Sequence, residues 1–302
     1  MKIKLLLIAS LIPCFVNAQK LVEESPLKRL SKFPVLTSDY IYYPSADFST
    51  ENSNGTVTSS EWRTTLQFAI PLKEKKTYLF NGIQHSMFHF NLETDQQAYQ
   101  NSETYQSFQY RLGLIKVLPK RWTLSLTLVP TIASDFNAPI ESDDFVIHAA
   151  AMAIKRSGTN FQYGFGLAYT SRFGNLTLVP LFSLTRKVGN WQTIGVLPTY
   201  LSHYYEINDQ SKVGITLNIN GNLYNVTLDQ NYSSFDLNRV AYSRITVGPE
   251  YLHKLFGDLY LSTSTGISLR NLVEVQDDQL NKELDFDIKS RFYFNIGLRI
   301  MK

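Results

Sequence analysis

The feature that most constrains the fold of this 302-residue chain is a two-residue period of apolar side chains that persists over long stretches. In residues 122–133, apolar side chains at even positions interleave with small and mostly polar ones at odd positions. Residues 161–169, 213–220 and 292–300 show the same alternation. Because successive side chains of a β-strand point to opposite faces, this period predicts strands with one apolar face. No window shows a sustained helical period, so we predict an all-β chain.

Thirteen strands follow from the alternation and from the turn residues between the runs. They span residues 39–49, 61–72, 77–91, 104–117, 122–134, 145–154, 161–171, 175–185, 191–206, 212–226, 238–252, 258–269 and 289–301. Most exceed the roughly five or six residues usual in a soluble sheet. Several match the roughly nine to eleven residues that a tilted strand needs to cross a bilayer.

Two architectures fit such strands. In a soluble sandwich or barrel the apolar face points inward, whereas in an outer-membrane barrel it contacts lipid and the small polar face lines the lumen. Strand length, an export signal and aromatic side chains near strand ends favour the second architecture. These aromatic residues are Trp62, Trp122, Tyr169, Trp191 and Phe292. We therefore predict an antiparallel transmembrane up-and-down β-barrel in the cell outer membrane of a Gram-negative bacterium.

The first residues have the pattern of a secretory signal peptide. Lys2 and Lys4 precede an apolar run over residues 5–16, which is too short to cross a bilayer as a helix. Small or tolerated residues follow, and cleavage is expected between Ala18 and Gln19. The export signal agrees with an outer-membrane location.

The expected organisation is a cleaved signal peptide over residues 1–18, an N-terminal extension over 19–37 and the barrel over 38–302. Cys14 is the only cysteine, so cleavage leaves a mature protein without thiol chemistry. A lipidated Cys14 is an alternative, but the Ile-Pro pair before it does not match the small residues of a lipobox. The formal net charge of +3, from 29 Lys and Arg against 26 Asp and Glu, is too small for a nucleic-acid-binding surface.

Charges divide the expected connections into two kinds. Four short basic connections follow every second strand, at residues 73–76, 120–121, 155–156 and 186–187. The alternating connections at 92–103 and 134–144 are longer and acidic. Short turns on one side and long loops on the other are typical of a barrel inserted from the periplasm, with the short side periplasmic.

This alternation breaks at residues 253–258, which resemble another short basic turn. Three expected strands lie between Lys187 and His253, whereas turns on the same side require an even number. Either one strand after residue 187 is assigned wrongly, or the turn faces outward. Because single-chain bacterial barrels have even strand numbers, thirteen must become twelve or fourteen. We favour about 12 strands within a range of 10–14, with 39–49 as the weakest strand.

Four stretches carry a family resemblance. They are Asn17-Ala18-Gln19, Glu61-Trp62-Arg63, Leu197-Pro198-Thr199-Tyr200 and Gly257-Asp258-Leu259-Tyr260-Leu261. Together they resemble an uncharacterised outer-membrane β-barrel family, a domain of unknown function common in Bacteroidetes-type bacteria. The resemblance covers most of the mature chain and implies a barrel with no assigned catalytic residue. In a departure from the usual pattern, the chain ends Ile300-Met301-Lys302 and not on the aromatic residue that the barrel-insertion machinery reads.

The histidines give no strong catalytic or metal-binding pattern. His85 and His89 share one face of a strand but lie about 13 Å apart, too far to bind one metal ion. Ser86 follows His85 and therefore points to the opposite face, so the two cannot form a nucleophile and base pair. His148 and His203 can each meet a serine on a neighbouring strand, which keeps a Ser/His site at the barrel rim open as an alternative.

The segment 274–287 is strongly acidic. We expect it to be a solvated loop, while calcium binding or a divalent-cation bridge to lipopolysaccharide is the alternative. The sequence contains no glycine-rich phosphate loop, nucleophile elbow or zinc motif. We therefore predict no enzymatic activity, no cofactor and no bound metal.

Charged residues on the predicted lumen face are the most informative candidates for function. They are Arg63, Arg111, Arg244, Glu250, Arg291 and Arg299. Arginines there either pair with carboxylates and help to fill the interior, or line a path that favours anions. Internal pairing is the favoured alternative.

The sequence thus predicts an outer-membrane barrel that is a porin-like passive channel for small solutes or a structural barrel. The alternative is a lipid-modifying outer-membrane enzyme with a Ser/His site at the rim. The expected partners are outer-membrane lipid and lipopolysaccharide, and the barrel-insertion machinery through the last strand. We expect a monomer that binds no nucleic acid.

Overall fold

The structure, a computed structural model, describes residues 34–50, 54–72, 76–94, 101–226, 238–277 and 279–301. The predicted signal peptide and its cleavage point at Ala18 and Gln19 lie outside the described residues. Strand β1 begins at Pro34, ahead of the expected start of the barrel at residue 38. No helix among the described residues is long and apolar enough to cross a membrane.

The described residues form β-strands joined by turns and two short 3-10 helices, at Pro119–Arg121 and Ser142–Asp144. The strands are β1 (Pro34–Ser49), β2 (Asn54–Pro71), β3 (Thr77–Thr94), β4 (Asn101–Leu118), β5 (Trp122–Ser134), β6 (Phe145–Arg156), β7 (Phe161–Thr170), β8 (Thr177–Val188), β9 (Trp191–Leu197), β10 (Tyr200–Glu206), β11 (Ser211–Asn225), β12 (Arg239–Phe256), β13 (Leu259–Gln276), β14 (Lys282–Ile288) and β15 (Phe292–Met301).

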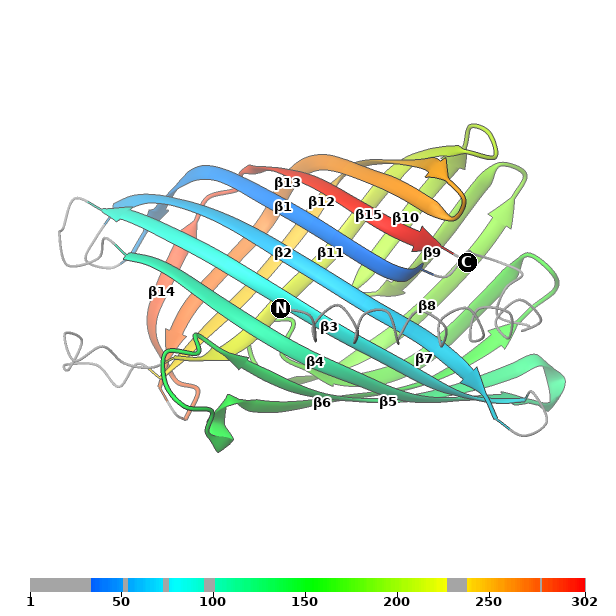
Figure 1. Ribbon diagram of the computed structural model, residues 1–302, viewed down its shortest axis with the longest axis horizontal. Coiled ribbons are helices and arrows are strands. Elements are labelled where there is room, and N and C mark those ends of the chain that lie inside the picture. The colour runs from blue at the N-terminus through cyan, green and yellow to red at the C-terminus, as the bar shows by residue number, and fades with distance from the viewer. Residues whose placement is uncertain are drawn as a thin grey trace, which may run out of the picture.

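These strands form one sheet that closes on itself (Figure 1). Consecutive strands from β1 to β13 pair antiparallel. β14 and β15 share one position in the wall, because both pair with β13 on one side and with β1 on the other. The 15 strands therefore fill fourteen positions. The predicted all-β antiparallel up-and-down barrel is confirmed.

The favoured number of twelve strands is wrong, because residues 191–206 form two strands and not one. They make the hairpin β9–β10, in which Val196 pairs with Tyr200. The hairpin adds a fourth strand between the turns at residues 189–190 and 257–258, so both turns lie at the same end of the barrel. The expected weakest strand, 39–49, is an integral part of β1.

The acidic segment 274–287 is not a loop. Glu274 lies in β13, and Asp285 and Asp287 lie in β14. In the connection between these strands, Asp277 accepts hydrogen bonds from the backbone and side-chain nitrogens of Asn281 at 2.7 and 2.8 Å. The acidic side chains are thus spread along two strands and the short connection between them.

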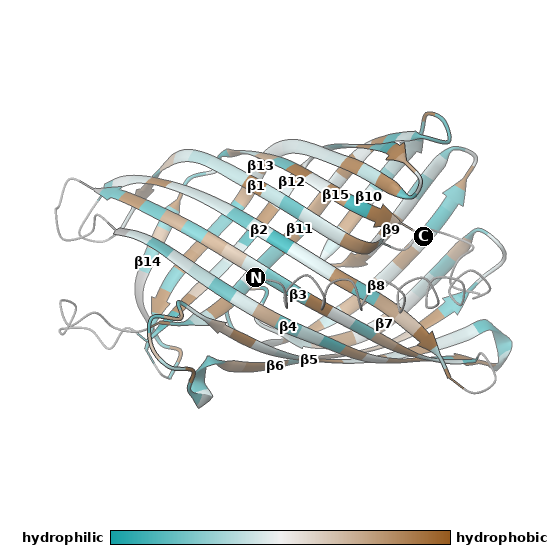
Figure 2. Ribbon diagram, in the orientation of Figure 1, coloured by the Kyte–Doolittle hydropathy of each residue, from teal (hydrophilic) through white to brown (hydrophobic). Residues whose placement is uncertain are grey.

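An apolar belt covers the outer face of the barrel. Hydrophobic and hydrophilic segments alternate along the strands (Figure 2). Exposed members of the belt are Tyr40, Trp62, Ile83, Tyr110, Leu112, Leu126, Leu128, Ile147, Phe165, Leu167, Ile215, Phe294 and Ile296. A closed barrel satisfies all its backbone hydrogen bonds, and an apolar outer face suits lipid. We call this surface the lipid-facing belt.

The two ends of the barrel differ. At one end, which we call the short-turn end, the strands are joined by residues 72–76, 119–121, 157–160, 189–190, 207–210 and 257–258. β3 and β4 are joined at the opposite end, as are β5 and β6 and also β11 and β12; we call this the long-loop end. β1 begins and β15 ends at the short-turn end (Figure 1). The basic pairs 120–121, 155–156 and 186–187 lie at or next to the short-turn end and the acidic connection 135–144 lies at the other end, as predicted. The turns 207–210 and 257–258, which carry an aspartate and no basic residue, and the two-residue β9–β10 turn at the long-loop end depart from the predicted pattern.

Towards the long-loop end the apolar pattern inverts. In β3, Leu92 is buried while Glu93 is exposed, and in β14 Phe286 is buried between exposed Asp285 and Asp287. An apolar inner face and a polar outer face are typical of a soluble sheet. The barrel therefore extends beyond the lipid-facing belt as a water-exposed barrel with its own hydrophobic core.

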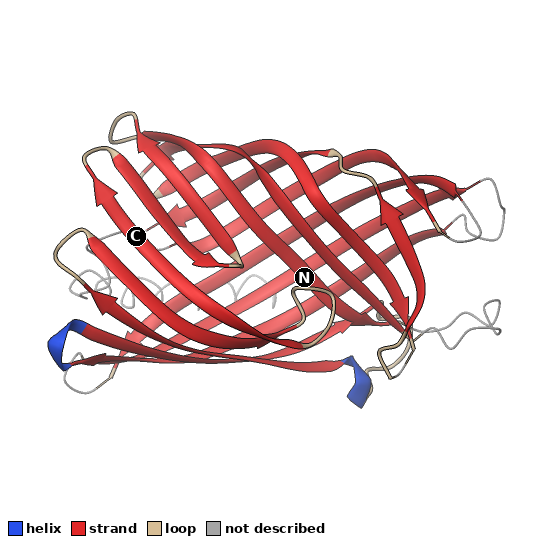
Figure 3. Cartoon of the chain, turned by 180° about the vertical axis from the view of Figure 1, so that it is seen from behind, coloured by secondary structure: helices blue, strands red, loops and turns tan. Residues whose placement is uncertain are grey.

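The wall has a seam beside β11. Because β9 and β10 have only 7 residues each, residues 220–224 of β11 have no strand partner on that side among the described residues. Beyond the seam, Asn225 pairs with Ser134 of β5. The β7–β8 connection, residues 171–176, lies next to this unpaired stretch of β11 and is hydrogen-bonded to β12 and β13 (Figure 3). We call this connection the strap.

Candidate functional site

Charged side chains from distant strands meet inside the barrel, where six arginines and three carboxylates form three clusters. The members are Arg63, Arg111, Arg172, Arg244, Arg291, Arg299, Asp39, Glu61 and Glu250. All six residues that the sequence suggested for the lumen face are among them. Except for Arg172, which lies in the strap, the alternation along the strands points these side chains inward, opposite the lipid-facing belt.

The first cluster joins the two ends of the sheet. Glu250 of β12 accepts hydrogen bonds from Arg299 Nη2 at 2.8 Å, Tyr204 Oη at 2.6 Å and Ser262 Oγ at 2.8 Å. Asp39 of β1 lies 3.7 Å from the same guanidinium. We call these residues the closure cluster, because they link β12, β13 and β15 to β1 where the barrel closes.

The second cluster places two arginines on one aromatic ring. The guanidinium carbons of Arg244 and Arg291 lie 3.5 and 5.4 Å from the ring centre of Tyr43. Both guanidinium groups donate to Ser59 Oγ, at 3.2 and 2.7 Å. Arg244 also donates to Asn271 Oδ1 at 2.7 Å. Aromatic, hydroxyl and amide groups thus stabilise these buried charges where an acid would be the usual partner.

The third cluster begins with an ion pair. Arg63 Nη2 donates to Glu61 Oε1, and Tyr242 Oη donates to the other oxygen of Glu61 at 3.3 Å. Arg63 Nη1 donates to Asn220 Oδ1 at 2.9 Å, across the interior from β2 to β11. This contact places the guanidinium of Arg63 well inside the wall.

Arg111 lies on the neighbouring part of the same inner surface. Its Nη2 donates to Gln84 Oε1 at 2.5 Å, and Thr65 donates to the same oxygen at 3.2 Å. Gly82 pairs with Arg111 in register and has no side chain to block it. The described residues provide no carboxylate partner for Arg111.

Arg172 of the strap completes the third cluster, which we call the arginine chamber. Burial, followed by the positive charges of Arg111 and Arg63, lowers the pKa of Arg172 to about 9. Arg172 was not predicted from the sequence, because it follows the predicted strand 161–171 and its side-chain direction there has no periodic signal. Only the folded position of the strap brings it to Arg63 and Arg111.

An aromatic core fills the interior at the long-loop end. Phe88 of β3 stacks on Tyr242 of β12 with ring centres 4.4 Å apart, and Tyr105 of β4 stacks on Tyr224 of β11 at 5.3 Å. Phe88, Tyr224 and Tyr242 are at most 2% exposed. β3 and β12 lie on opposite sides of the barrel, so the Phe88–Tyr242 stack narrows the interior there, whereas β4 and β11 both lie beside β5 at this end.

The histidines contact hydroxyl and amide groups. Ser171 Oγ lies 3.1 Å from His148 Nε2, so His148 contacts a serine as predicted. His203 contacts Thr193 at 2.8 Å and not a serine. His85 contacts Gln106 at 3.1 Å, and His89 contacts Thr104 at 3.0 Å. Among the described residues, no three His, Cys, Asp or Glu side chains come together as a metal site.

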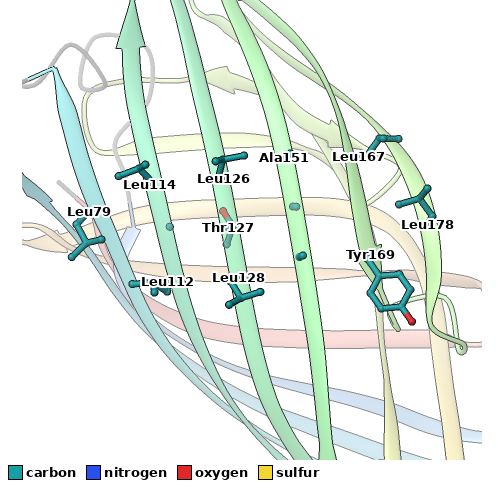
Figure 4. A pocket seen from close by; sticks show the side chains of 13 residues that line it. Leu79, Leu112, Leu114, Leu126, Thr127, Leu128, Ala151, Leu167, Tyr169 and Leu178 are labelled. Carbon is teal, nitrogen blue, oxygen red and sulfur yellow. The ribbon is translucent and has the colours of Figure 1, made fainter.

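A separate hollow of about 530 Å³ opens on the outer face (Figure 4). The small side chains of Ala149 and Ala151 on β6 form part of its floor, with Leu126 and Leu128 of β5 on one side and Leu167 of β7 on the other. These residues belong to the lipid-facing belt, so lipid chains and not a transported solute are expected to fill the hollow.

The closed barrel, the lipid-facing belt and the charged interior define a transmembrane β-barrel of the outer membrane. The chain belongs to the family described as domain of unknown function DUF6268, whose model matches residues 26–301. This match confirms the resemblance to an uncharacterised barrel family. No curated protein matches the chain.

A search of solved structures finds outer-membrane proteins with low similarity to this chain. The COG4313 outer membrane channel from Pseudomonas putida F1 is 13% identical with a TM-score of 0.45, over 92% of this chain and 99% of that chain. The toluene transporter TodX from Pseudomonas putida is 9% identical with a TM-score of 0.38, over 88% of each chain. The translocator domain of the autotransporter NalP from Neisseria meningitidis is 8% identical with a TM-score of 0.37, over 97% of each chain. At such TM-scores we draw no functional conclusion from these similarities.

Proposed function

We propose that the protein is a passive outer-membrane channel for small solutes. The observation that best supports a channel is that charged side chains deep inside the wall are partly exposed. The side chain of Arg63 is 24% exposed and that of Arg299 is 22% exposed. Exposure inside a closed wall requires space for water next to these groups. A hydrated, charged interior enclosed by a lipid-facing wall is what a solute channel needs.

The aromatic core limits this path. The Phe88–Tyr242 stack crosses the interior at the long-loop end, and the Tyr105–Tyr224 stack lies in the same hydrophobic core. A solute entering from the loop side must pass these rings. We therefore expect a small single-channel conductance for the natural protein.

Single-channel recording in a planar bilayer tests the proposal. Phe88→Ala removes one ring from the core and should increase the conductance over that of the natural protein. Phe108→Ala is the matched control, because this phenylalanine is 47% exposed on the outer face. Heat-modifiable migration on a gel verifies that each variant forms a barrel. If the natural protein and Phe88→Ala both fold but conduct no more than the bare bilayer, the channel proposal is wrong.

A structural barrel is the second candidate, and the aromatic core is the observation that favours it. If the rings fill the whole cross-section, neither the natural protein nor Phe88→Ala conducts, and the barrel then acts as a rigid support for its loops. A lipid-modifying enzyme is less well supported. The Ser171–His148 pair lies in the strap and β6, and the described hydrogen bonds of the histidines run to hydroxyl and amide groups, without the acid that orients a catalytic imidazole.

The proposed surroundings follow from the architecture. Lipid covers the belt, and lipopolysaccharide contacts the side nearest the long loops. The barrel closes within one chain, which supports a monomer. Insertion through the C-terminal strand β15 is supported by Tyr293 and the exposed apolar residues Phe292 and Phe294 in that strand.

A further inference from the structure

Three arginines from separate parts of the chain meet in the arginine chamber beside β11, where Arg63 Nη1 donates to Asn220 Oδ1 at 2.9 Å and the carbonyl oxygen of Arg172 lies against Gly221. Arg63 comes from β2, Arg111 from β4 and Arg172 from the strap. Glu61 is the carboxylate of this cluster, and it is already bound by Arg63 and Tyr242. The chamber therefore carries three positive charges against one negative charge, a formal balance of 3 − 1 = +2.

The strap is fixed so that Arg172 stays in the chamber. Ser171 is bound to His148 of β6 at 3.1 Å, and the carbonyl oxygen of Arg172 accepts from Ser243 Oγ of β12 at 3.0 Å. Asn175 accepts from Gln276 of β13 at 2.8 Å. The strap is thus held at three points on three strands, which positions a loop arginine as firmly as a strand residue.

Such a concentration of like charge is unfavourable without an anion. Burial, followed by the positive charges of Arg111 and Arg63, lowers the pKa of Arg172 to about 9 against the opposing charge of Glu61, and no carboxylate of the described residues forms an ion pair with Arg172. At neutral pH all three guanidinium groups remain charged. Because their side chains are partly exposed to the interior, a small anion can reach them.

We propose that Arg63, Arg111 and Arg172 bind a small oxyanion, a carboxylate or a phosphate group, inside the barrel. The chemistry of the site supports this class of ligand, since the planar fork of a guanidinium group matches two oxygens of a carboxylate or phosphate. The neutral groups around the site, Gln84 and Asn220, can add hydrogen bonds. The proposal deepens the channel function and rests on it for its biological meaning, but the binding itself can be measured without conduction.

Isothermal titration of the purified, detergent-solubilised protein with inorganic phosphate and with succinate tests the site. We expect saturable binding of at least one probe to the natural protein. Arg111→Gln and Arg172→Gln should each weaken binding about tenfold or more, because each removes a charge-assisted contact. Arg270→Gln is the matched control, since Arg270 is exposed on the outer face of β13, and it should bind like the natural protein. Preference for phosphate or succinate identifies which oxyanion fits.

A second set of variants separates binding from folding. Arg172→Lys keeps the charge and loses the fork, so it should bind more weakly than the natural protein and more tightly than Arg172→Gln. Heat-modifiable migration identifies folded variants. The site is refuted if the folded natural protein shows no saturable binding. It is also refuted if folded Arg111→Gln and folded Arg172→Lys bind the probe as tightly as the natural protein.

Bilayer recording distinguishes this failure from failure of the channel. Conductance without oxyanion binding refutes the site and keeps the channel. Binding without conductance refutes the channel and keeps the site. If both hold, phosphate should reduce the chloride current through the natural protein more than the current through Arg111→Gln.

Discussion

Replacing Glu250 with Gln should destabilise the barrel at the place where its first and last strands meet. The carboxylate of Glu250 accepts hydrogen bonds from Arg299, Tyr204 and Ser262, and its side chain is 6% exposed. The amide has the same shape but no charge, and it leaves Arg299 with Asp39 at 3.7 Å as its remaining acidic partner. Breaking a buried ion pair by removing one partner costs about 3–5 kcal/mol. Because Arg299 is 22% exposed and water can partly replace the carboxylate, we expect about 3 kcal/mol.

Equilibrium unfolding by urea in lipid vesicles, followed through the fluorescence of the 3 tryptophans, measures this change. A double-mutant cycle with Arg299→Gln identifies its origin. If the two residues act as a pair, Arg299→Gln should cost much less in the Glu250→Gln background than alone. A loss under about 1 kcal/mol for Glu250→Gln, or full additivity of the two changes, would refute the role of the closure cluster.

Two further variants test other parts of the account. Lys187→Met should lower the unfolding free energy by less than about 1 kcal/mol in the same urea assay. The reason is that Lys187 and Glu206 are 38% and 34% exposed, so water screens the pair. A loss as large as that of Glu250→Gln would contradict this. Gly221→Val should displace the strap, since a Cβ atom at this position would lie 2.3 Å from the carbonyl oxygen of Arg172. Limited trypsin digestion should then cut the folded variant after Arg172 faster than the natural barrel, and unchanged protection would show that the strap does not pack on β11.

The alternation of apolar residues predicted the barrel because lipid and lumen impose opposite demands on neighbouring side chains. β5 shows this most clearly, since the predicted range 122–134 and the observed strand coincide. Long strands and short basic turns also predicted that the short turns face the periplasm, which stays a prediction. The same rule placed Arg111 and Glu250 on the inner face from the sequence alone.

The hairpin β9–β10 escaped prediction because its turn preserves the alternation. Val196 pairs with Tyr200 four residues later, so odd-numbered side chains face outward on both sides of the turn, as exposed Trp191 and Tyr205 show. Pro198 was the available signal, since proline rarely continues a central strand. Recognising it would have restored the even strand number and the position of the turn at 257–258.

Strand β14 and Arg172 escaped prediction for other reasons. β14 lies where the barrel extends beyond lipid, and there Phe286 points inward while Asp285 and Asp287 point outward, the reverse of the pattern in the belt. The side chain of Arg172 lies in a loop, where direction depends on contacts with β6, β12 and β13 that are distant in sequence. Local pattern carries no information on such contacts.

The central claim is that the apolar face of each strand contacts lipid and the polar face lines the interior. Single cysteines at residues 125–129 of β5 test it directly, because the predicted mature protein has no cysteine. A fluorophore attached to each cysteine is measured in vesicles that contain brominated lipid, which quenches fluorophores in the hydrocarbon region. The account predicts strong quenching at Leu126 and Leu128, which are 44% and 47% exposed, and weak quenching at Ser125, Thr127 and Val129. Uniform quenching, or strong quenching at the odd positions only, would contradict it.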